Sequence, residues 1–490
     1  MTLEWVTTHW VAVVLLIVYT TILLRNAYIG SRVSRGLDGF YVGQRSMGGV
    51  AIGISFFATL ASTNSYIGHA GKGYEYGVAW MLLGAMLVLF TWVSWRWVGP
   101  KLRLFANQWD ALTLPDYLGS RFVEGEVARH PLGIAAAAVI VFASLLYLVA
   151  IFKGAGHLFE HFLRISYEGG VLVTLLIVVL YTSIGGFVSV VRTDVVQGLL
   201  MMLGAMMLFY FVTRAAGGVG AVIELGERVD TRHLFELNAG VPFVVLLGIS
   251  LSGSLKLLVD PRQLSRFFAL KDEREVRRGI WVAVLGLFIV LACLFPIGLY
   301  ARLLMDGVTD TDQIIPTLVN DPNVFPLWAA DFLIVAIVAA AMSSMDSVLL
   351  VAASTLYKNI VAPFRETTRE LQWTRFAVAG FAVVAAVMAL RPPGDIIEIT
   401  IFSGSLYAVC FFPAVVLGLH WQRGSAAAVL ASMAVGIAVL FAWIGAGLRG
   451  ELHEVFPALA ASLITYVAVS WFSSSRLLPG QYSDAPQGDP

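Results

Sequence analysis

Four adjacent polar residues interrupt an otherwise apolar segment, residues 47–71. They are Ser62, Thr63, Asn64 and Ser65. Backbone at the depth of a membrane leaves helical geometry only where it is buried in protein or lines a cavity, and its freed carbonyl groups can then bind a cation. The same side chains could instead hydrogen-bond within their own helix or join two helices. The run therefore predicts either a broken helix with an ion site or a polar packing surface.

A second stretch, residues 339–347, combines small residues with hydroxyl groups. Ala340, Ser343, Ser344 and Ser347 fall on one face of a helix at about 100° per residue. Sodium is a hard cation that needs several oxygen ligands, so two hydroxyl groups opposite freed carbonyl groups could enclose it. Close helix packing explains the small residues equally well. Ion binding and packing both remain open on this pattern alone.

Two aspartates lie inside apolar segments. An ionisable residue there costs about 2.5–3.5 kcal/mol on insertion scales and usually has a function. Asp346 projects within about 60° of Ser343 on the same helix. Asp194 lies close to Arg192, and an ion pair at the membrane interface is the alternative explanation for it. The sequence makes both aspartates candidates for a functional role.

Other titratable residues have simpler interpretations. Lys256 and Asp260 are one helical turn apart, which favours a local ion pair whose lysine reaches toward the cytoplasm. His69, His157 and His161 lie near predicted outer ends of helices, and no metal spacing accompanied by carboxylates is recognised among them. No organic cofactor is expected.

The composition defines the surroundings of these residues. Of the 490 residues, 58% are hydrophobic and 13% are charged, whereas soluble domains carry about 25% charged residues. Apolar runs of about 20 residues recur along the chain and do not alternate as barrel strands would. The formal net charge is zero, so nothing indicates a nucleic-acid partner. The chain is predicted to be an all-α integral membrane protein in a lipid bilayer, with no obligatory protein partner evident.

Thirteen transmembrane helices are predicted. Basic residues concentrate in alternate loops, and such loops face the cytoplasm, so the N-terminus is predicted outside and the C-terminus in the cytoplasm of the cell inner membrane. Residues 1–472 are predicted to form a single transmembrane domain, and 473–490 a short disordered tail. The spans are expected at 10–29, 47–71, 75–98, 132–155, 169–186, 190–213, 240–259, 279–303, 328–360, 374–391, 395–420, 425–446 and 454–472.

Four motifs, in order along the chain, resemble the sodium:solute symporter family, which includes proline, pantothenate, sugar and sialic-acid symporters. The resemblance covers about residues 38–425. The motifs are the entry Phe40-Tyr41-Val42-Gly43-Gln44-Arg45-Ser46-Met47-Gly48, the pair Tyr181-Thr182-Ser183-Ile184-Gly185-Gly186-Phe187 and Thr193-Asp194-Val195-Val196-Gln197, the loop from Pro261 to Arg266-Phe267-Phe268-Ala269, and the stretch from Ser343 to Ser347.

This resemblance implies a fold and three sites. The fold would be a LeuT-like core of two inverted five-helix repeats over about residues 46–421, with one helix before it and two after it. The sodium site would use carbonyl groups of Ala58, Ala61 and Ala340 and hydroxyl groups of Ser343 and Ser344. A second site, for a cation or a proton, would use Asp194, Asp346 and Ser347, beside Ser343. Substrate would lie near the membrane midplane, against Leu60, Ser62, Asn64, Ser65, Ser403 and Ser405.

The function that the resemblance implies is secondary active transport rather than enzymatic catalysis. Sodium-coupled symport of a small polar metabolite by alternating access is the leading interpretation. Sugar-type members carry an Asn-x-Ser-x-Glu-Gln run at the helix break, which this chain lacks, so an organic acid or amino acid is favoured over a sugar. A proton-coupled carrier on the same fold and a transporter-like sensor acting through a partner remain alternatives.

Overall fold

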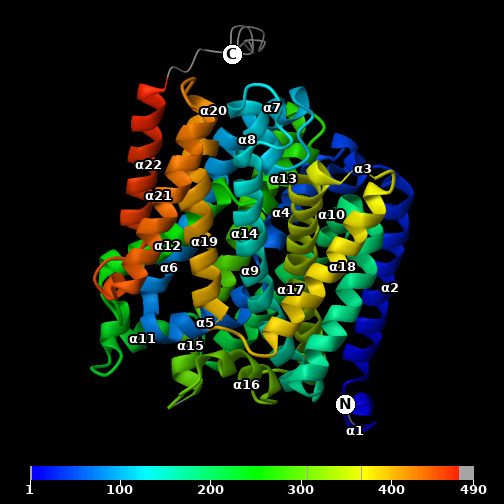
Figure 1. Cartoon of the computed structure of the whole chain (residues 1–490). Helices are drawn as coiled ribbons and strands as arrows, with labels where there is room; N and C mark the ends of the chain where they lie inside the picture. The colour runs from blue at the N-terminus through cyan, green and yellow to red at the C-terminus, as the bar shows by residue number, and fades with distance from the viewer. Residues whose placement is uncertain (1–2, 306, 366, 395, 474–490) are drawn as a thin grey trace.

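The protein is an elongated bundle of helices (Figure 1). This computed structural model describes residues 3–305, 307–365, 367–394 and 396–473, without the side chains of Leu3 and Asn64. The predicted tail, 473–490, therefore lies outside the described residues, apart from its first position. The described residues are helical or irregular, with an isolated β-bridge between Met47 and Leu270.

The longer helices form the bundle, and shorter ones cover its ends. The longer helices are α2 (Trp10–Val33), α4 (Gly49–Leu60), α5 (Thr63–Tyr76), α6 (Met81–Val93), α9 (Pro131–Leu163), α10 (Tyr167–Ala215), α12 (Phe243–Leu255), α14 (Glu273–Leu294), α17 (Leu327–Thr355), α18 (Glu370–Ala389), α19 (Ile396–Phe412), α21 (Ala426–Gly445) and α22 (Val455–Phe472). The shorter ones are α1 (Leu3–Thr8), α3 (Leu37–Val42), α7 (Gly99–Gln108), α8 (Leu114–Phe122), α11 (Ala221–Glu227), α13 (Pro261–Ala269), α15 (Ile297–Leu304), α16 (Ile314–Asn320) and α20 (Gly418–His420).

Eleven helical runs among the described residues are long and apolar enough to cross a membrane. The helix α10 has 49 residues and contains two of the predicted spans, 169–186 and 190–213. It bends at Gly186, whose φ of 61° favours glycine, and a Cβ there would lie 2.7 Å from the Phe40 ring. The predicted span 47–71 is divided between α4 and α5. The chain is thus an all-helical, multi-pass membrane protein.

The central helix of the bundle is α17. In its most apolar window 94% of the residues are buried, against 28% in α2 and in α22 and 33% in α21. The helices α4, α9, α10 and α18 all contact α17. Small residues let these neighbours approach, and the apolar outer faces of α2, α21 and α22 are left for lipid. Functional groups on α17 are therefore held in the most enclosed part of the protein.

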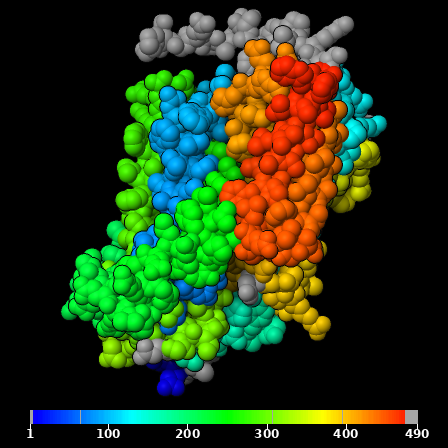
Figure 2. Space-filling model, turned by 90° about the vertical axis from the view of Figure 1, so that its left-hand side faces the viewer, coloured from blue at the N-terminus to red at the C-terminus, as the bar shows by residue number. Residues whose placement is uncertain are grey.

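The two ends of the bundle differ. The helix α1 and the C-terminal end of α22 lie at opposite ends (Figure 1), and α11, α15 and α16 lie at the end of α1. The segment that connects α10 to α12, coloured green, forms a protrusion at the lower left of Figure 2. The opposite end carries α7, α8 and α20 (Figure 1).

Candidate ion and substrate sites

The break between α4 and α5 frees carbonyl groups in the middle of the bundle. In a continuous helix the Ser62 N–H would donate to the Ala58 carbonyl and the Ser65 N–H to the Ala61 carbonyl. Here the Ser62 N–H donates to Ser65 Oγ at 3.2 Å, and the Ser65 N–H donates to the Ser62 carbonyl at 2.8 Å. Both carbonyl groups are therefore released from the helical ladder, in residues that are fully buried.

The predicted serines of α17 meet the end of α4. Ser344 Oγ donates to the Thr59 carbonyl oxygen at 3.0 Å, so this hydroxyl lies at the last turn of α4. Ser343 Oγ donates to Asp194 Oδ1 at 2.7 Å. Ala340 precedes them by one turn and is fully buried. The structure thus brings the carbonyl-rich end of α4 and the hydroxyl face of α17 together.

Asp194 is the centre of a buried polar cluster. Its Oδ2 atom accepts from Ser55 Oγ at 2.5 Å and from an Arg266 terminal nitrogen at 3.0 Å. The arginine and aspartate side chains are 1% and 0% exposed. The alternative of an interfacial pair with Arg192 is therefore wrong, because Arg192 is exposed while Asp194 faces α4, α13 and α17.

Asp346 completes this cluster. It accepts from the Tyr181 hydroxyl at 3.1 Å and from Ser347 Oγ at 3.2 Å. Arg266 also donates to Ser347 Oγ at 2.7 Å, which links the two carboxylates through one guanidinium group. Two carboxylates and one guanidinium leave room for one further positive charge or proton in a fully buried region.

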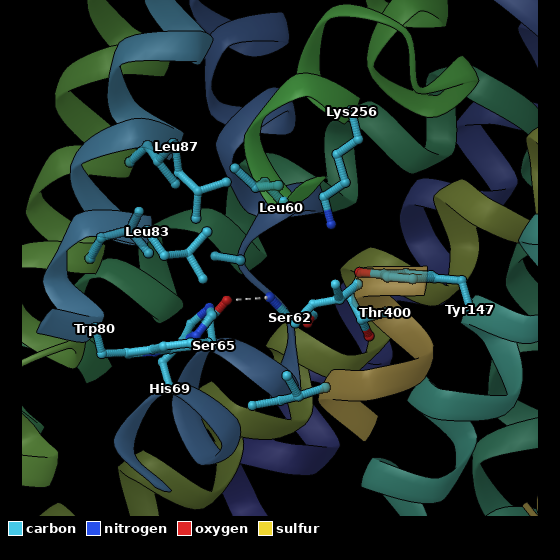
Figure 3. A pocket seen from close by; sticks show the side chains of 16 residues that line it. Leu60, Ser62, Ser65, His69, Trp80, Leu83, Leu87, Tyr147, Lys256 and Thr400 are labelled. Carbon is cyan, nitrogen blue, oxygen red and sulfur yellow. Dashed lines mark hydrogen bonds between the residues drawn. The ribbon is translucent and has the colours of Figure 1, made fainter. Parts of the chain in front are cut away.

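A cavity lies on the other side of the helix break (Figure 3). It is lined by Leu60, Ala61, Ser62, Ser65, His69, Trp80, Leu83, Leu87, Tyr147, Gly253, Lys256, Leu287, Leu291, Ile397, Thr400 and Ile401. Three of the predicted substrate residues, Leu60, Ser62 and Ser65, are among them. Asn64 is also predicted to contact substrate, but its side chain is not among those that the structure describes.

The two predicted serines of α19 face neighbouring helices instead. Ser403 Oγ donates to the Ala143 carbonyl of α9 at 3.2 Å. Ser405 Oγ hydrogen-bonds Ser252 Oγ of α12 at 2.8 Å. Neither lines the cavity, where α19 contributes Ile397, Thr400 and Ile401. Their hydroxyl groups hold α19 against α9 and α12.

The expected ion pair between Lys256 and Asp260 is wrong. Asp260 is the N-cap of α13 and binds the side chain of Arg262, whose Nε lies 3.0 Å from both carboxylate oxygens. Lys256 begins the short helix η5 (Lys256–Leu258) and points into the cavity (Figure 3). The pairing rule failed because Asp260 is the N-cap of the next helix, where its carboxylate accepts from the backbone and the side chain of Arg262.

A second cavity, which we call the vestibule, adjoins the first. Trp80, Ile397 and Ile401 line both. The vestibule is also lined by Arg449, which pairs with Glu454 at 2.9 Å and with Glu398 at 3.1 Å. Burial lowers the pKa of nearby His453 from its usual value, so this imidazole is neutral at neutral pH. The vestibule thus places charged side chains next to the central cavity.

Sequence reasoning missed several of the residues at these sites. Arg266 and Tyr181 stand inside the recognised motifs, yet no pattern predicted that they bind Asp194 and Asp346. Tyr147 and Thr400 gave no signal, because single polar residues in apolar helices are common. The signal that could have identified Lys256 was its charge inside an apolar segment.

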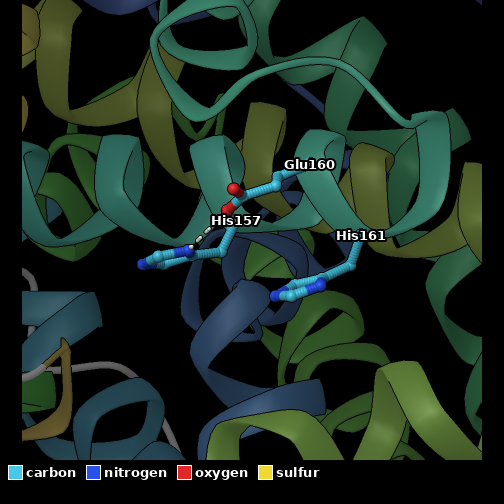
Figure 4. A group of neighbouring side chains, drawn as sticks. All are labelled: His157, Glu160 and His161. Carbon is cyan, nitrogen blue, oxygen red and sulfur yellow. Dashed lines mark hydrogen bonds and ion pairs between the residues drawn. The ribbon is translucent and has the colours of Figure 1, made fainter.

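One further group could hold a metal ion. His157, Glu160 and His161 lie on one face of α9, with ligand atoms within 4.8 Å of one another (Figure 4). No metal-binding pattern was recognised among these histidines from the sequence, because Glu160 between them was not considered. His157 Nδ1 lies 3.3 Å from Glu160, and His161 Nε2 lies 3.0 Å from the Gln313 amide. These contacts already occupy part of the donor set.

An all-helical membrane bundle with an interrupted helix, and a cavity beside the interruption, is an arrangement found in secondary transporters. The chain belongs to the sodium:solute symporter family, whose sequence profile matches residues 40–436.

Similar transporters match over nearly the whole chain. The sodium/pantothenate symporter of Escherichia coli is 30% identical over 457 residues, covering 90% of this chain and 91% of the relative. That of Haemophilus influenzae is 27% identical, covering 94% and 96%. The high-affinity proline transporter PutP of Bacillus subtilis is 28% identical, covering 94% and 98%. The chain is thus similar to transporters, not to enzymes.

Solved structures agree on the fold. A Na+-coupled sialic acid symporter in a substrate-bound, outward-open state matches with a TM-score of 0.80 at 18% identity, covering 96% of this chain and 99% of that one. Mhp1, a nucleobase-cation-symport-1 family transporter, matches with a TM-score of 0.57 at 14% identity, covering 88% and 92%. These likenesses show a shared helical architecture.

Proposed function

We propose that the protein couples the entry of sodium to the uptake of a small polar metabolite by alternating access, with an organic acid or amino acid favoured over a sugar. The observation that carries the proposal is the break between α4 and α5, where carbonyl groups leave the helical ladder between the hydroxyl face of α17 and the cavity. An ion bound there would fix the same backbone that lines the cavity.

The proposed sodium ligands belong to two helices. They are the carbonyl oxygens of Ala58, Ala61 and Ala340 and the hydroxyl oxygens of Ser343 and Ser344. Five oxygens in a buried place suit a hard cation. The release of two of these carbonyl groups and the position of Ser344 Oγ at the end of α4 support the assignment.

The second site is proposed at Asp194, Asp346 and Ser347. The two carboxylates share one guanidinium group, so a further sodium ion or a proton would balance the charge. This cluster also favours the second candidate function, a proton-coupled carrier on the same fold. Sodium remains the preferred coupling ion because the released carbonyl groups of α4 offer neutral oxygen ligands, which do not accept a transferable proton.

We also propose the number, the repeat arrangement and the orientation of the transmembrane helices. Dividing α10 at Gly186 and counting α4 with α5 as one interrupted span gives the thirteen-helix arrangement. The run from α12 through η5 to α13 is a second interrupted helix, as an inverted five-helix repeat requires of its first member. One transmembrane domain, residues 1–472 with its core at about 46–421, would lie in the inner membrane with the N-terminus outside and the C-terminus in the cytoplasm.

Thermal stability of the detergent-purified protein tests the ion site. A ligand that binds only the folded state raises the free energy of unfolding by RT ln(1 + [L]/Kd). We expect a higher Tm in sodium chloride than in equal potassium or choline chloride, and loss of this difference in Ser344→Ala. Ser354→Ala is the matched control, because Ser354 is buried on the same helix without a hydrogen-bond partner among the described residues. Equal Tm values in all three salts would refute the proposal.

A further inference from the structure

The central cavity contains a lysine, Lys256, that forms no ion pair with any described carboxylate. The Lys256 side chain is 8% exposed, and among the described residues its ammonium group makes no hydrogen bond or ion pair. Its Nζ atom lies 5.8 Å from the centre of the Tyr147 ring, and Asp260 attracts it electrostatically without a direct contact. Asp260, the nearby carboxylate, is held by Arg262. An uncompensated buried charge costs several kcal/mol, so such a residue inside a membrane protein usually serves a ligand.

The direction of Lys256 is set by the packing around its stem. Gly404 of α19 lies against it, and a Cβ at that position would be 3.4 Å from Lys256 Cδ and 2.9 Å from the Ser252 carbonyl. The close approach of α19 to α12 thus confines the stem, and the ammonium group extends toward the cavity (Figure 3). The packing of α19 against α12 therefore fixes the position of the Lys256 ammonium group.

Polar atoms lie on both sides of the cavity, with Tyr147 and Thr400 on the side of Lys256 and with Ser65 and His69 beside Trp80 (Figure 3). The hydroxyl groups of Tyr147 and Thr400 lie close to its ammonium group in Figure 3, with Ser62 beneath them. Thr400 Oγ1 already donates to the Ile396 carbonyl at 2.7 Å, and the Tyr147 hydroxyl is hydrogen-bonded to Arg262 and Ser62. The Lys256 ammonium group is therefore the donor left for a carboxylate, which accepts several hydrogen bonds.

The opposite side of the cavity carries mainly apolar side chains, next to Ser65 and His69. Leu83 and Leu87 of α6 and the Trp80 ring face the polar side across the cavity (Figure 3). Leu287 and Leu291 of α14 are further apolar residues of the lining. A ligand that places its carboxylate at Lys256 would therefore rest a hydrocarbon body against these side chains.

No acidic side chain is present among the described residues that line the cavity. The substrate ammonium group of an amino acid would thus have no carboxylate to meet, while its own carboxylate would occupy Lys256. A simple organic acid leaves no such group unpaired. The charge of the cavity therefore favours an organic acid over an amino acid as the substrate.

We propose that Lys256 binds the carboxylate of a monocarboxylic acid with an apolar body, and that this residue selects organic acids over amino acids and neutral solutes. The proposal rests on the proposed function, because it treats the central cavity as the transport site.

Three probes with one carbon skeleton test the proposal on the purified protein in sodium chloride: 3-methylbutanoate, 3-methylbutanamide and valine. A shorter set, propanoate, propanamide and alanine, repeats the comparison. We expect both carboxylates to raise the Tm, with an apparent affinity at least about tenfold higher than that of the matching amide or amino acid. The amide loses the contact between its charge and Lys256, and the amino acid buries an ammonium group that has no carboxylate partner in the cavity.

Two variants separate this role from a structural one. Lys256→Gln should lose the preference of the carboxylate over the amide and keep the full stabilisation by sodium, because Lys256 is not a proposed sodium ligand. Lys256→Arg keeps the charge and should keep the preference, which provides the test should Lys256→Gln fail to fold.

Several results would overturn the proposal: equal shifts for a carboxylate and its amide, an unchanged preference in Lys256→Gln, or no shift with any probe in a protein that sodium stabilises. A carboxylate shift that is independent of sodium would instead refute the proposed coupling and leave the carboxylate site standing. The two hypotheses therefore fail in different ways.

Discussion

Two polar regions lie on either side of the break between α4 and α5. They differ in whether their charged side chains have partners. Around Asp194, every charged group has partners: Arg266 contacts Asp194, Ser347 and Ser55, and Asp346 accepts from Tyr181. In the cavity, Lys256 has no counter-ion, and His69 Nδ1 has no hydrogen-bond partner among the described residues. The groups of the first region satisfy one another, whereas in our proposal the second region is completed by a ligand.

The largest expected effect comes from removing the cation of the complete region. Arg266→Met leaves Asp194 and Asp346 buried without their shared partner, and breaking a buried pair in this way costs roughly 3–5 kcal/mol. We expect a large fall in Tm and in the yield of folded protein. The control is Arg192→Met, which removes an exposed arginine near the same aspartate and should leave the Tm almost unchanged.

The same substitution in the incomplete region should act in the opposite direction. Lys256→Met removes a buried charge that has no partner, so without substrate the protein should be more stable, by about 1–3 kcal/mol. The change in Tm is the measurement, with the exposed Lys271→Met as the control. Destabilisation comparable to that of Arg266→Met would mean that Lys256 belongs to a satisfied network, and the contrast between the two regions would be lost.

The smallest effect concerns the packing of α19 beside the cavity. Ser405→Ala removes the hydrogen bond to Ser252 Oγ and should lower stability by about 1 kcal/mol. Since Ser405 does not line the cavity, the Tm shift caused by 3-methylbutanoate should stay within twofold of the wild-type value. Loss of that shift would place Ser405 in the substrate site after all.

The features that the sequence predicted are those that depend on residues close together in the chain. Hydrophobic runs predicted the helices, and four motifs identified the family, because both signals are local in sequence. The small-residue face of Ala340, Ser343 and Ser344 also predicted which side of α17 meets α4. The sodium and substrate assignments themselves stay predictions.

The parts that the sequence did not reveal depend on distant segments. Arg266 contacts Asp194 across 72 positions of chain, and no periodicity relates them. Helical spacing suggested a pair between Lys256 and Asp260, but the helix is interrupted there, and Asp260 instead caps α13. Local rules are thus least dependable at interrupted helices, which is where the proposed sites lie.

The central claim, that sodium and a carboxylate travel together, is tested most directly by the entry of 22Na+ into proteoliposomes at zero membrane potential. External 3-methylbutanoate should accelerate sodium entry in the wild-type protein, and 3-methylbutanamide should not. Ser344→Ala should abolish the acceleration, while Ser354→Ala should retain it. Sodium entry that is the same with and without either carboxylate probe would contradict the account.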